Sequence, residues 1–332
     1  MEYDWERKFP FLEIDKSIVG RLFDGILEER NIINIIPINE GCRTTNYIVE
    51  TNEFQKKYIL KIFFSTEQNH KKEIKLLTKL KETILVPRIY KISTDEIIQN
   101  REYAIYEYME GKSIGEAISE GYVLEEIFVR DVARYLAKIH NHKFNKTGFL
   151  DENLNLKDEL PPLISWYEEF MGDRAQKRLG KSIIQKINNI IKKNKKILDK
   201  LDEKVRLVHG DFQGTNILIK NGQVSGILDW EFAMAGHPLA DIGQFFRYEE
   251  YFNNNLLQAF KNEYNKNSDY KLEKNWYKIS KLRDLVNLIQ IINGEEDMPN
   301  KYSNIKNIVI NNIDILDNKD LKKEMKIIKF TN

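Results

Sequence analysis

Two short polar segments, separated by a predicted β-hairpin, constrain the fold of this chain more than any other feature of its sequence. The first, HGDFQGTN, contains Asp211 and Asn216, and the second, ILDWE, contains Asp229. Between them, Asn221-Gly222 separates two apolar runs, and this dipeptide favours a type I′ turn because both of its residues tolerate a positive φ angle. A hairpin returns the chain to the point from which it left. We therefore expect Asp211, Asn216 and Asp229 to meet at one end of two paired strands.

An aspartate, an asparagine and a later aspartate are the side chains that phosphoryl transfer requires. One carboxylate must lie beside the attacking hydroxyl, to orient it and accept its proton, and further oxygen atoms must hold the Mg²⁺ that bridges the nucleotide phosphates. Mg²⁺ takes carboxylate and amide oxygens as ligands. The D-x-x-x-x-N spacing of Asp211 and Asn216 is also that of the catalytic loop of protein kinases. The hairpin is therefore predicted to carry a kinase-type site.

The two segments resemble the signature of the aminoglycoside phosphotransferase and choline kinase superfamily of small-molecule kinases, which pairs HGDxxxxN with a later D-W or D-x-E. The resemblance implies that Asp211 is the catalytic base or orienter and that Asn216 and Asp229 are metal ligands. It also implies that Asp241, in GHPLADIG, braces the catalytic loop from a following helix. We expect the imidazole of His209 to brace the same loop through backbone hydrogen bonds.

The resemblance implies an α+β, bilobal fold like that of eukaryotic protein kinases. Its N-terminal lobe has an antiparallel sheet plus a helix, and its C-terminal lobe is mainly helical with a catalytic β-hairpin. The sequence pattern agrees, because the strand-like runs IINIIPI, NYIVE and KYILKIFF precede the helical HKKEIKLLTKL. We expect a leading helix at residues around 11–30, a nucleotide-binding lobe with the hinge at 1–109, and a catalytic and substrate-binding lobe at 110–332.

The N-terminal lobe is expected to supply the nucleotide contacts. Lys61, in YILKIFF, stands where the third-strand lysine of a kinase contacts the phosphates, and Glu73 is its expected ion-pair partner on the helix. The segment AIYEYM resembles the adenine-binding hinge of the family, with Tyr106 as gatekeeper and the backbone of Glu107 and Met109 facing the base.

The phosphate loop departs from the protein-kinase pattern. NEGCRTTNY contains no GxGxxG and offers Gly41 with Arg43, Thr44 and Thr45. We therefore expect the phosphates to be held by backbone amides and by the hydroxyls of Thr44 and Thr45.

The sequence constrains the identity of the acceptor less than that of the nucleotide, because these motifs concern nucleotide binding and catalysis. Aminoglycosides are polycations, so their receptor should present carboxylates. Glu231 is the first candidate, and the others are Glu249, Glu250, Glu295, Glu296 and Asp297. The leading interpretation is an ATP- or GTP-dependent, Mg²⁺-requiring O-phosphotransferase of an aminoglycoside-type antibiotic, with a role in resistance. A metabolite kinase for choline, homoserine, a sugar or methylthioribose is the alternative. A non-catalytic, nucleotide-binding pseudokinase is the alternative of another class.

The composition of the chain narrows the range of its other expected binding partners. The 52 Lys and Arg residues nearly balance 51 Asp and Glu, which argues against nucleic acid as the main partner. One cysteine, Cys42, cannot form an intramolecular disulfide, and no apolar run approaches the roughly 20 residues that span a bilayer. We expect a cytoplasmic monomer or weak dimer without a membrane partner.

One motif points to a different enzyme class. GKSIG, at residues 111–115, matches the GxSxG of serine esterases. However, Ser113 and Glu116 have the spacing of a helix capping box, which favours a structural role for this serine.

Overall fold

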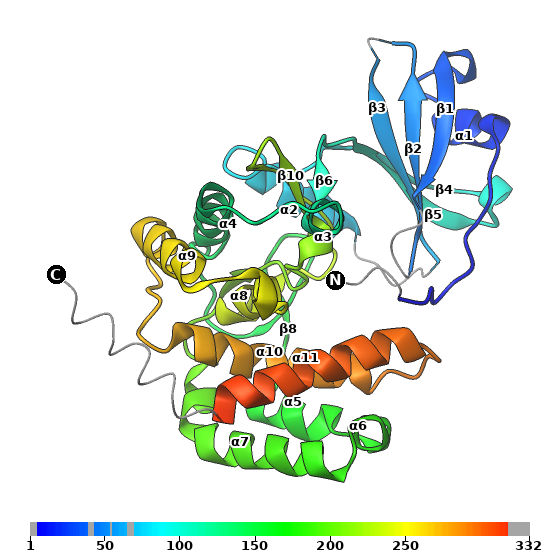
Figure 1. Ribbon diagram of the computed structural model, residues 1–332. Helices are drawn as coiled ribbons and strands as arrows, with labels where there is room; N and C mark the ends of the chain where they lie inside the picture. Colours follow the sequence, from blue (N-terminus) through cyan, green and yellow to red (C-terminus); the bar gives the residue numbers. More distant parts are fainter. Residues whose placement is uncertain (1–4, 39–42, 54, 65–69, 318–332) are drawn as a thin grey trace.

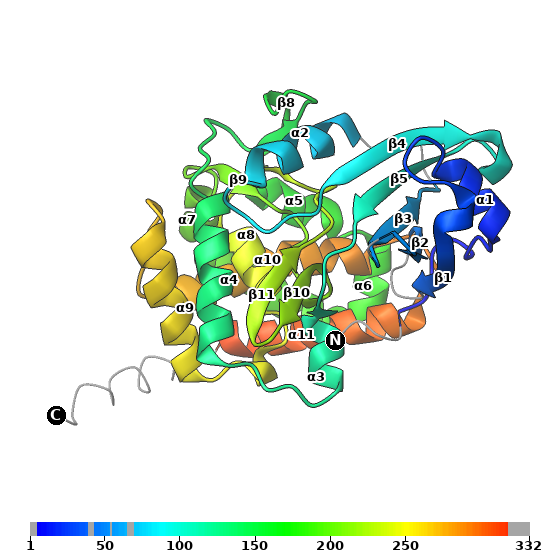
Figure 2. The ribbon, with the colours of Figure 1, turned by 90° about the horizontal axis from the view of Figure 1, so that it is seen from above.

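The computed structural model describes residues 5–38, 43–53, 55–64 and 70–317 (Figure 1). An antiparallel sheet with the strand order β1-β2-β3-β5-β4 lies at one end of the molecule, and helices make up most of the rest. The strands of this sheet are β1 (Ile32–Ile38), β2 (Thr45–Thr51), β3 (Lys57–Ile62), β4 (Ile89–Asp95) and β5 (Arg101–Glu107). Seen from above, the sheet again stands to one side of the helical part (Figure 2). The expected bilobal α+β fold is confirmed.

The sheet is covered on one face by helix α1 (Lys16–Leu22). Every second side chain of β2 is buried, as period-two alternation requires, and Val49 packs in one core with Leu22 of the helix. The helix is much shorter than the expected run over residues 11–30. Asp15 caps its start by accepting a hydrogen bond from the Ile18 N–H, and the chain turns away at Gly25, whose φ is +80°.

Helix α2 (His70–Leu80) coincides with the predicted HKKEIKLLTKL. Its buried Glu73, Leu77 and Leu80 share a face, as predicted. Leu77 and Leu80 belong to the same continuous core as the helices of the C-terminal lobe. The helix therefore joins the two lobes through packing.

The helical lobe is built around this large core. Its helices are α3 (Ile114–Ser119), α4 (Glu126–Ile139), α5 (Leu163–Phe170), α6 (Asp173–Leu179), α7 (Lys181–Lys200), α8 (Leu239–Phe245), α9 (Asn254–Asn267), α10 (Trp276–Ile292) and α11 (Pro299–Asp317). A small sheet in the order β8-β7-β12-β9 contains β7 (Gly148–Leu150), β8 (Leu156–Glu159), β9 (Arg206–Val208) and β12 (Met234–Gly236). Within the described residues, no helix is both long and apolar enough to cross a membrane.

The predicted hairpin consists of β10 (Ile217–Lys220) and β11 (Gln223–Ile227). Asn221 and Gly222 both have positive φ angles, 52° and 75°, as a type I′ turn requires. The short strand β6 (Lys112–Ser113) follows the hinge and pairs with β10. Gly111 lies at this crossing, where a Cβ atom would stand 2.4 Å from Ser225 Oγ, so only glycine fits.

The esterase-like GKSIG motif has a structural role. The Ser113 hydroxyl accepts a hydrogen bond from the Glu116 N–H at 3.1 Å and caps the start of α3.

Candidate active site

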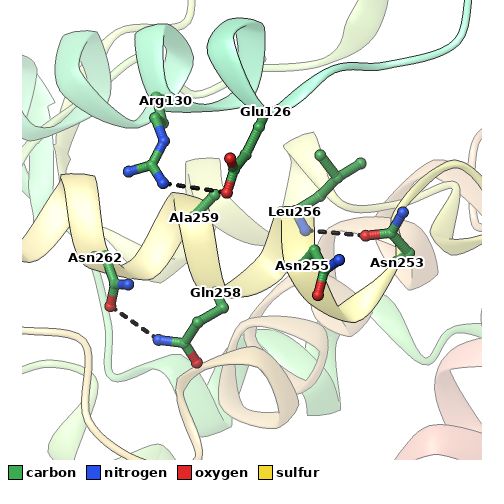
Figure 3. A pocket seen from close by; sticks show the side chains of 8 residues that line it. All are labelled: Glu126, Arg130, Asn253, Asn255, Leu256, Gln258, Ala259 and Asn262. Carbon is green, nitrogen blue, oxygen red and sulfur yellow. Dashed lines mark hydrogen bonds and ion pairs between the residues drawn. The ribbon is translucent and has the colours of Figure 1, made fainter.

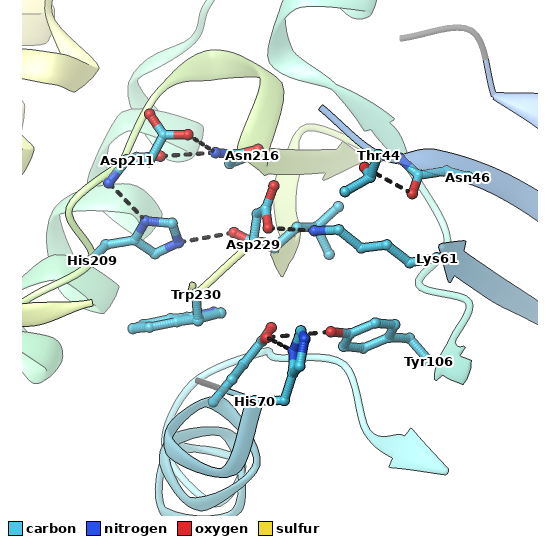
Figure 4. Close-up of polar contacts among 12 residues, drawn as sticks. Thr44, Asn46, Lys61, His70, Tyr106, His209, Asp211, Asn216, Asp229 and Trp230 are labelled. Carbon is cyan, nitrogen blue, oxygen red and sulfur yellow. Dashed lines mark hydrogen bonds and ion pairs between the residues drawn. The ribbon is translucent and has the colours of Figure 1, made fainter. Parts of the chain in front are cut away.

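The hairpin brings the three predicted oxygen-bearing residues together (Figure 4). Asp211 follows β9, Asn216 ends the 3₁₀ turn at Gly214–Asn216, and Asp229 follows β11. The side-chain amide of Asn216 donates to the backbone oxygen and to Oδ2 of Asp211, both at 2.9 Å. The backbone carbonyl of Asn216 accepts a hydrogen bond from the Leu228 N–H at 2.8 Å, which holds the residue preceding Asp229.

The catalytic loop is braced from helix α8 by Asp241, which is completely buried. Asp241 accepts hydrogen bonds from the N–H groups of His209, at 2.7 Å, and Gly210, at 3.0 Å. The His140 ring lies 3.1 Å from the same carboxylate. Gly210 has a φ of +84°, and a Cβ atom there would lie 2.3 Å from the carbonyl of Phe232. Glycine is therefore required where the loop passes the segment after Asp229.

His209 links the two segments through its imidazole. Nε2 lies 2.8 Å from the carbonyl oxygen of Leu228, and Nδ1 accepts a hydrogen bond from the Asp211 N–H at 3.3 Å. These partners assign the proton to Nε2, because only a donor can face a carbonyl. The ring therefore holds the loop in place, and both of its nitrogens are engaged.

Gln244 is a bracing residue that the sequence analysis missed. Its Oε1 accepts from the Phe212 N–H at 2.7 Å, and its Nε2 donates to the Gly210 carbonyl at 2.8 Å. It lies three positions after Asp241, on the same face of α8. That spacing is the signal that could have identified it.

Asp229 and Lys61 form an ion pair of 2.7 Å. Burial alone would lower the pKa of Lys61, but the carboxylates of Asp229, Glu231 and Glu73 outweigh it and raise this pKa. Burial would raise the pKa of Asp229, and the ammonium group reverses that shift. Both side chains are therefore charged.

The expected ion pair between Lys61 and Glu73 is not formed among the described residues. Glu73 accepts a hydrogen bond from the Tyr106 hydroxyl at 3.3 Å instead. The reason is that Asp229 comes within 2.7 Å of the lysine, while Tyr106 holds the glutamate toward β5.

Lys72, on α2, also went unnoticed in the sequence. Its ammonium group donates to the carbonyls of Glu231 and Ala233, both at 2.9 Å, and burial lowers its pKa.

Burial and the charge of Asp229 raise the pKa of the Glu231 carboxyl to about 7. Lys61, Lys72 and Arg43 are among the positive charges acting on Glu231, and all three come from the N-terminal lobe. Glu231 therefore faces the nucleotide side of the site.

The phosphate loop differs from its expected arrangement. Thr45 is fully buried and its hydroxyl accepts from the Leu12 N–H at 3.0 Å, so this side chain faces the N-terminal segment. Alternation along β2 puts Asn46 on the opposite face, paired in register with Lys61. The Thr44 hydroxyl donates to the Asn46 amide oxygen at 3.2 Å. Asn46 is thus the site residue that sequence reasoning missed here. Gly41 and Cys42 lie outside the described residues.

The predicted hinge follows β5. Tyr106 is buried beside Glu73, and the Glu107 N–H donates to the carbonyl of Arg88 at 2.7 Å. Among the described residues, the Met109 N–H has no hydrogen-bond partner. The Met109 side chain packs close to Gly226 of β11.

Glu249 and Glu250 lie in a 3₁₀ turn beside helices α10 and α11. Burial raises the pKa of Glu249, and Lys281 of α10 opposes the shift. Within the described parts of the chain, neither glutamate has a hydrogen bond or ion pair to the catalytic loop.

The donor set fits a magnesium ion. The Asn216 amide directs its nitrogen to Asp211, which leaves its oxygen available, and Asp229 uses only Oδ1 for Lys61. One carboxylate and one amide oxygen are suitable Mg²⁺ ligands when nucleotide phosphates complete the coordination. Clusters of three or more His, Cys, Asp or Glu side chains that could hold a metal by themselves do not occur in the described part of the chain.

A separate groove of about 410 Å³ lies between α4 and α9 (Figure 3). Its lining residues are Glu126, Arg130, Asn253, Asn255, Leu256, Gln258, Ala259 and Asn262. None of them belongs to the site described above.

Comparison with solved structures supports the fold. The crystal structure of a thermostable mutant of aminoglycoside phosphotransferase APH(4)-Ia, in a ternary complex with ADP and hygromycin B, superposes with a TM-score of 0.67 at 13% identity, covering 91% of this chain and 100% of that one. The choline kinase LicA from Streptococcus pneumoniae gives 0.62 at 18% identity, with coverage of 90% and 98%.

Related proteins match this chain over only about half of its length. Acyl-CoA dehydrogenase family member 11 of Homo sapiens is 24% identical over 165 residues, which is 48% of this chain and 20% of that protein. The probable acyl-CoA dehydrogenase IBR3 of Arabidopsis thaliana is 22% identical over 178 residues, 52% of this chain and 22% of that protein. The matched region is thus about a fifth of each relative's length.

The family itself is established by the match of residues 34–274 to the phosphotransferase enzyme family. This range includes the catalytic loop, the hairpin and the Lys61 strand described above. The chain is therefore a member of the phosphotransferase enzyme family, with the bilobal fold shared by aminoglycoside phosphotransferases and choline kinase.

Proposed function

We propose that the protein transfers the γ-phosphoryl group of ATP to a hydroxyl group of a small molecule. The observation that carries this proposal is the convergence of Asp211, Asn216 and the Lys61–Asp229 ion pair at one end of the hairpin. Residues 1–109 would bind the nucleotide, and residues 110–332 would supply catalysis and bind the acceptor.

Asp211 is assigned the role of base and orienter. Its Oδ2 accepts hydrogen bonds from Asn216 and Gln213, at 2.9 and 3.3 Å, so Oδ1 is available to a hydroxyl group. Burial raises the pKa of Asp211, and the positive charge of Arg247 opposes the shift. A raised pKa makes the carboxylate a better proton acceptor at neutral pH, provided that it stays ionised.

Lys61, Asn216 and Asp229 are assigned to the triphosphate. Asn216 and Asp229 would hold Mg²⁺, which supplies charge neutralisation at the phosphate oxygens when bound. Lys61 would contact the phosphates, and Asn46 stands beside it in the sheet register. The free N–H of Met109 is suited to an adenine nitrogen. ADP and AMP-PNP occupy structures with this fold, which favours ATP over GTP.

The acceptor is proposed to be a cationic alcohol, with an aminoglycoside-type antibiotic first and choline second. Structures with the same fold include a complex with hygromycin B and a choline kinase. Glu249 and Glu250 remain candidates for binding a cation, whereas Glu231 is assigned to the nucleotide side because the charges of Lys61 and Arg43 act on it.

The test is a panel of aminoglycosides, choline and other metabolite alcohols with labelled ATP, followed by mass spectrometry of the product. We expect acceptor-dependent ADP formation and a product heavier by one phosphoryl group. Binding of ATP without transfer to any acceptor, and without slow hydrolysis, would favour the pseudokinase instead.

A further inference from the structure

A buried ion pair lies behind the catalytic loop. Arg247 follows α8 and Asp284 belongs to α10; Nε and Nη2 of the arginine donate to the two carboxylate oxygens, both at 2.9 Å. The two side chains are 2% and 0% exposed. Two charges withdrawn from water are maintained only by good geometry, and the bidentate arrangement supplies it. The guanidinium group is therefore fixed in position and orientation.

This fixed guanidinium group determines the orientation of Gln213. Arg247 Nη1 donates to Gln213 Oε1 at 3.0 Å. A guanidinium group has no acceptor, so the amide of Gln213 must face it with its oxygen and not with its nitrogen. The amide nitrogen then points the other way, and it donates to Oδ2 of Asp211 at 3.3 Å.

Asp211 thus has two unlike oxygens. Oδ2 receives N–H groups from Gln213 and Asn216, and within the described residues Oδ1 has no hydrogen-bond partner. Without Arg247, the Gln213 amide could turn over and present its oxygen to the carboxylate, and the repulsion would rotate Asp211 away from its position.

We propose that Asp284, Arg247 and Gln213 form a positioning relay that holds Asp211 with Oδ1 toward the acceptor hydroxyl. The relay deepens the proposed function and rests on it for its catalytic consequence. Of the three, Gln213 is the residue that bonds Asp211, so the relay acts on the carboxylate through it. The competing explanation is that the ion pair merely joins α8 to α10.

The relay is tested by Gln213→Glu. The new carboxylate keeps a strong partner in Arg247, so the fold is retained, but it can no longer donate to Asp211. We expect kcat to fall about 10- to 100-fold, which is the effect of losing a hydrogen bond to a charged group, with the KM for ATP unchanged. Gln258→Glu on α9 is the matched control, because the Gln258 side chain donates to Asn262 at the surface (Figure 3), and its kcat should equal that of the unmodified protein. An unchanged kcat in Gln213→Glu would overturn the relay.

A second variant distinguishes an effect on catalysis from an effect on the stability of the fold. Arg247→Met combined with Asp284→Leu replaces both buried charges by apolar side chains, which avoids an unpaired charge. We expect a lower kcat at the same folded fraction and the same KM for ATP. A loss of stability without a change in kcat would show that the pair only joins the helices, and would overturn the proposal.

A measurement without catalysis separates failure of the relay from failure of the proposed function. In protein with ¹⁵N-labelled glutamine, the side-chain amide signal of Gln213 should shift both in Asp211→Asn and in the double variant, because Gln213 bonds both partners. A response to both variants supports the relay even if no acceptor is phosphorylated. No response to either would overturn it even in an active enzyme.

Discussion

The two loops that flank the proposed triphosphate site are supported in different ways. The catalytic loop, residues 209–216, is held by Asp241 and Gln244, which are 0% and 4% exposed and belong to the core of the same lobe. The phosphate loop, residues 43–46, is held by a peripheral segment: Arg7 donates to the Thr44 carbonyl at 2.6 Å. Buried hydrogen bonds are protected from water, whereas exposed ones compete with it. We therefore expect the catalytic side to be the stiffer of the two.

The peripheral segment, residues 5–14, also reaches the other lobe. Glu6 accepts hydrogen bonds from the N–H groups of Asn300, at 2.7 Å, and Lys301, at 3.2 Å, at the start of α11. Lys8 pairs with Glu296 at 2.6 Å. The phosphate loop is therefore tied to the C-terminal lobe through this segment as well as through the hinge. Disturbing the catalytic loop should affect turnover and stability, and disturbing the segment should affect nucleotide binding.

Asp211→Asn gives the largest expected effect. It removes the proton acceptor but keeps the size of the side chain, so kcat should fall about 10²- to 10⁴-fold, the usual worth of general base catalysis. Steady-state kinetics on the best acceptor measures this, and titration with a fluorescent nucleotide should show nearly unchanged binding. Unchanged turnover would remove Asp211 from its assigned role.

Asp241→Ala is expected to have the second-largest effect. It leaves the N–H groups of His209 and Gly210 without their buried acceptor, so the free energy of unfolding should fall by about 3 kcal/mol or more. Urea unfolding measures this, with Asp158→Ala on the exposed strand β8 as control. Equal stability of the two variants would contradict the contrast between the loops.

Acid should weaken the catalytic side through His237, which precedes α8. Burial holds the pKa of His237 well below its ordinary value of 6.5, so the folded protein keeps it neutral while the unfolded chain takes up a proton. The free energy of unfolding should therefore decrease as the pH falls below about 6.5, by at most about 1.4 kcal/mol per pH unit for this group.

His237→Asn checks this assignment. Nδ1 of His237 accepts a hydrogen bond from the Leu239 N–H at 3.2 Å, and the asparagine oxygen can replace it without titrating. Unfolding curves recorded between pH 7 and 5 should show a shallower decline for the variant. Parallel declines in the two proteins would exclude His237 as the cause.

Arg7→Gln is expected to have the smallest effect. The variant loses the part-buried hydrogen bond from Arg7 to the Thr44 carbonyl and the contact of the guanidinium group with the Phe9 carbonyl. The KM for ATP should rise about 3- to 10-fold, with kcat and stability nearly unchanged. Arg30→Gln, at an exposed position outside the segment, is the control. A fall in kcat without a change in KM would show that the segment supports catalysis and not nucleotide binding.

Much of the fold was accessible from the sequence because its signals are local. Helix α2 follows from its apolar periodicity, and the hairpin follows from Asn221-Gly222. The leading helix was predicted too long, since apolar spacing alone does not reveal where a backbone turn such as that at Gly25 ends a helix. Thr45 was placed in the site by its residue type, but the alternation of β2 turns it away and brings Asn46 to the Lys61 face.

Local sequence signals specify which chemical groups stand near one another along the chain: the Asp211–Asn216 spacing and the return of Asp229 across a tight turn. The pairing of charges from distant segments depends on how the folded elements pack: Lys61 contacts Asp229 instead of Glu73, Lys72 donates to the carbonyl of Glu231, and Arg247 pairs with Asp284. The reason is that turns and periodicity are encoded within a few residues. The partner of a buried charge depends instead on which elements pack together, because a charge removed from water must pair with whatever oppositely charged or polar group that packing brings within reach.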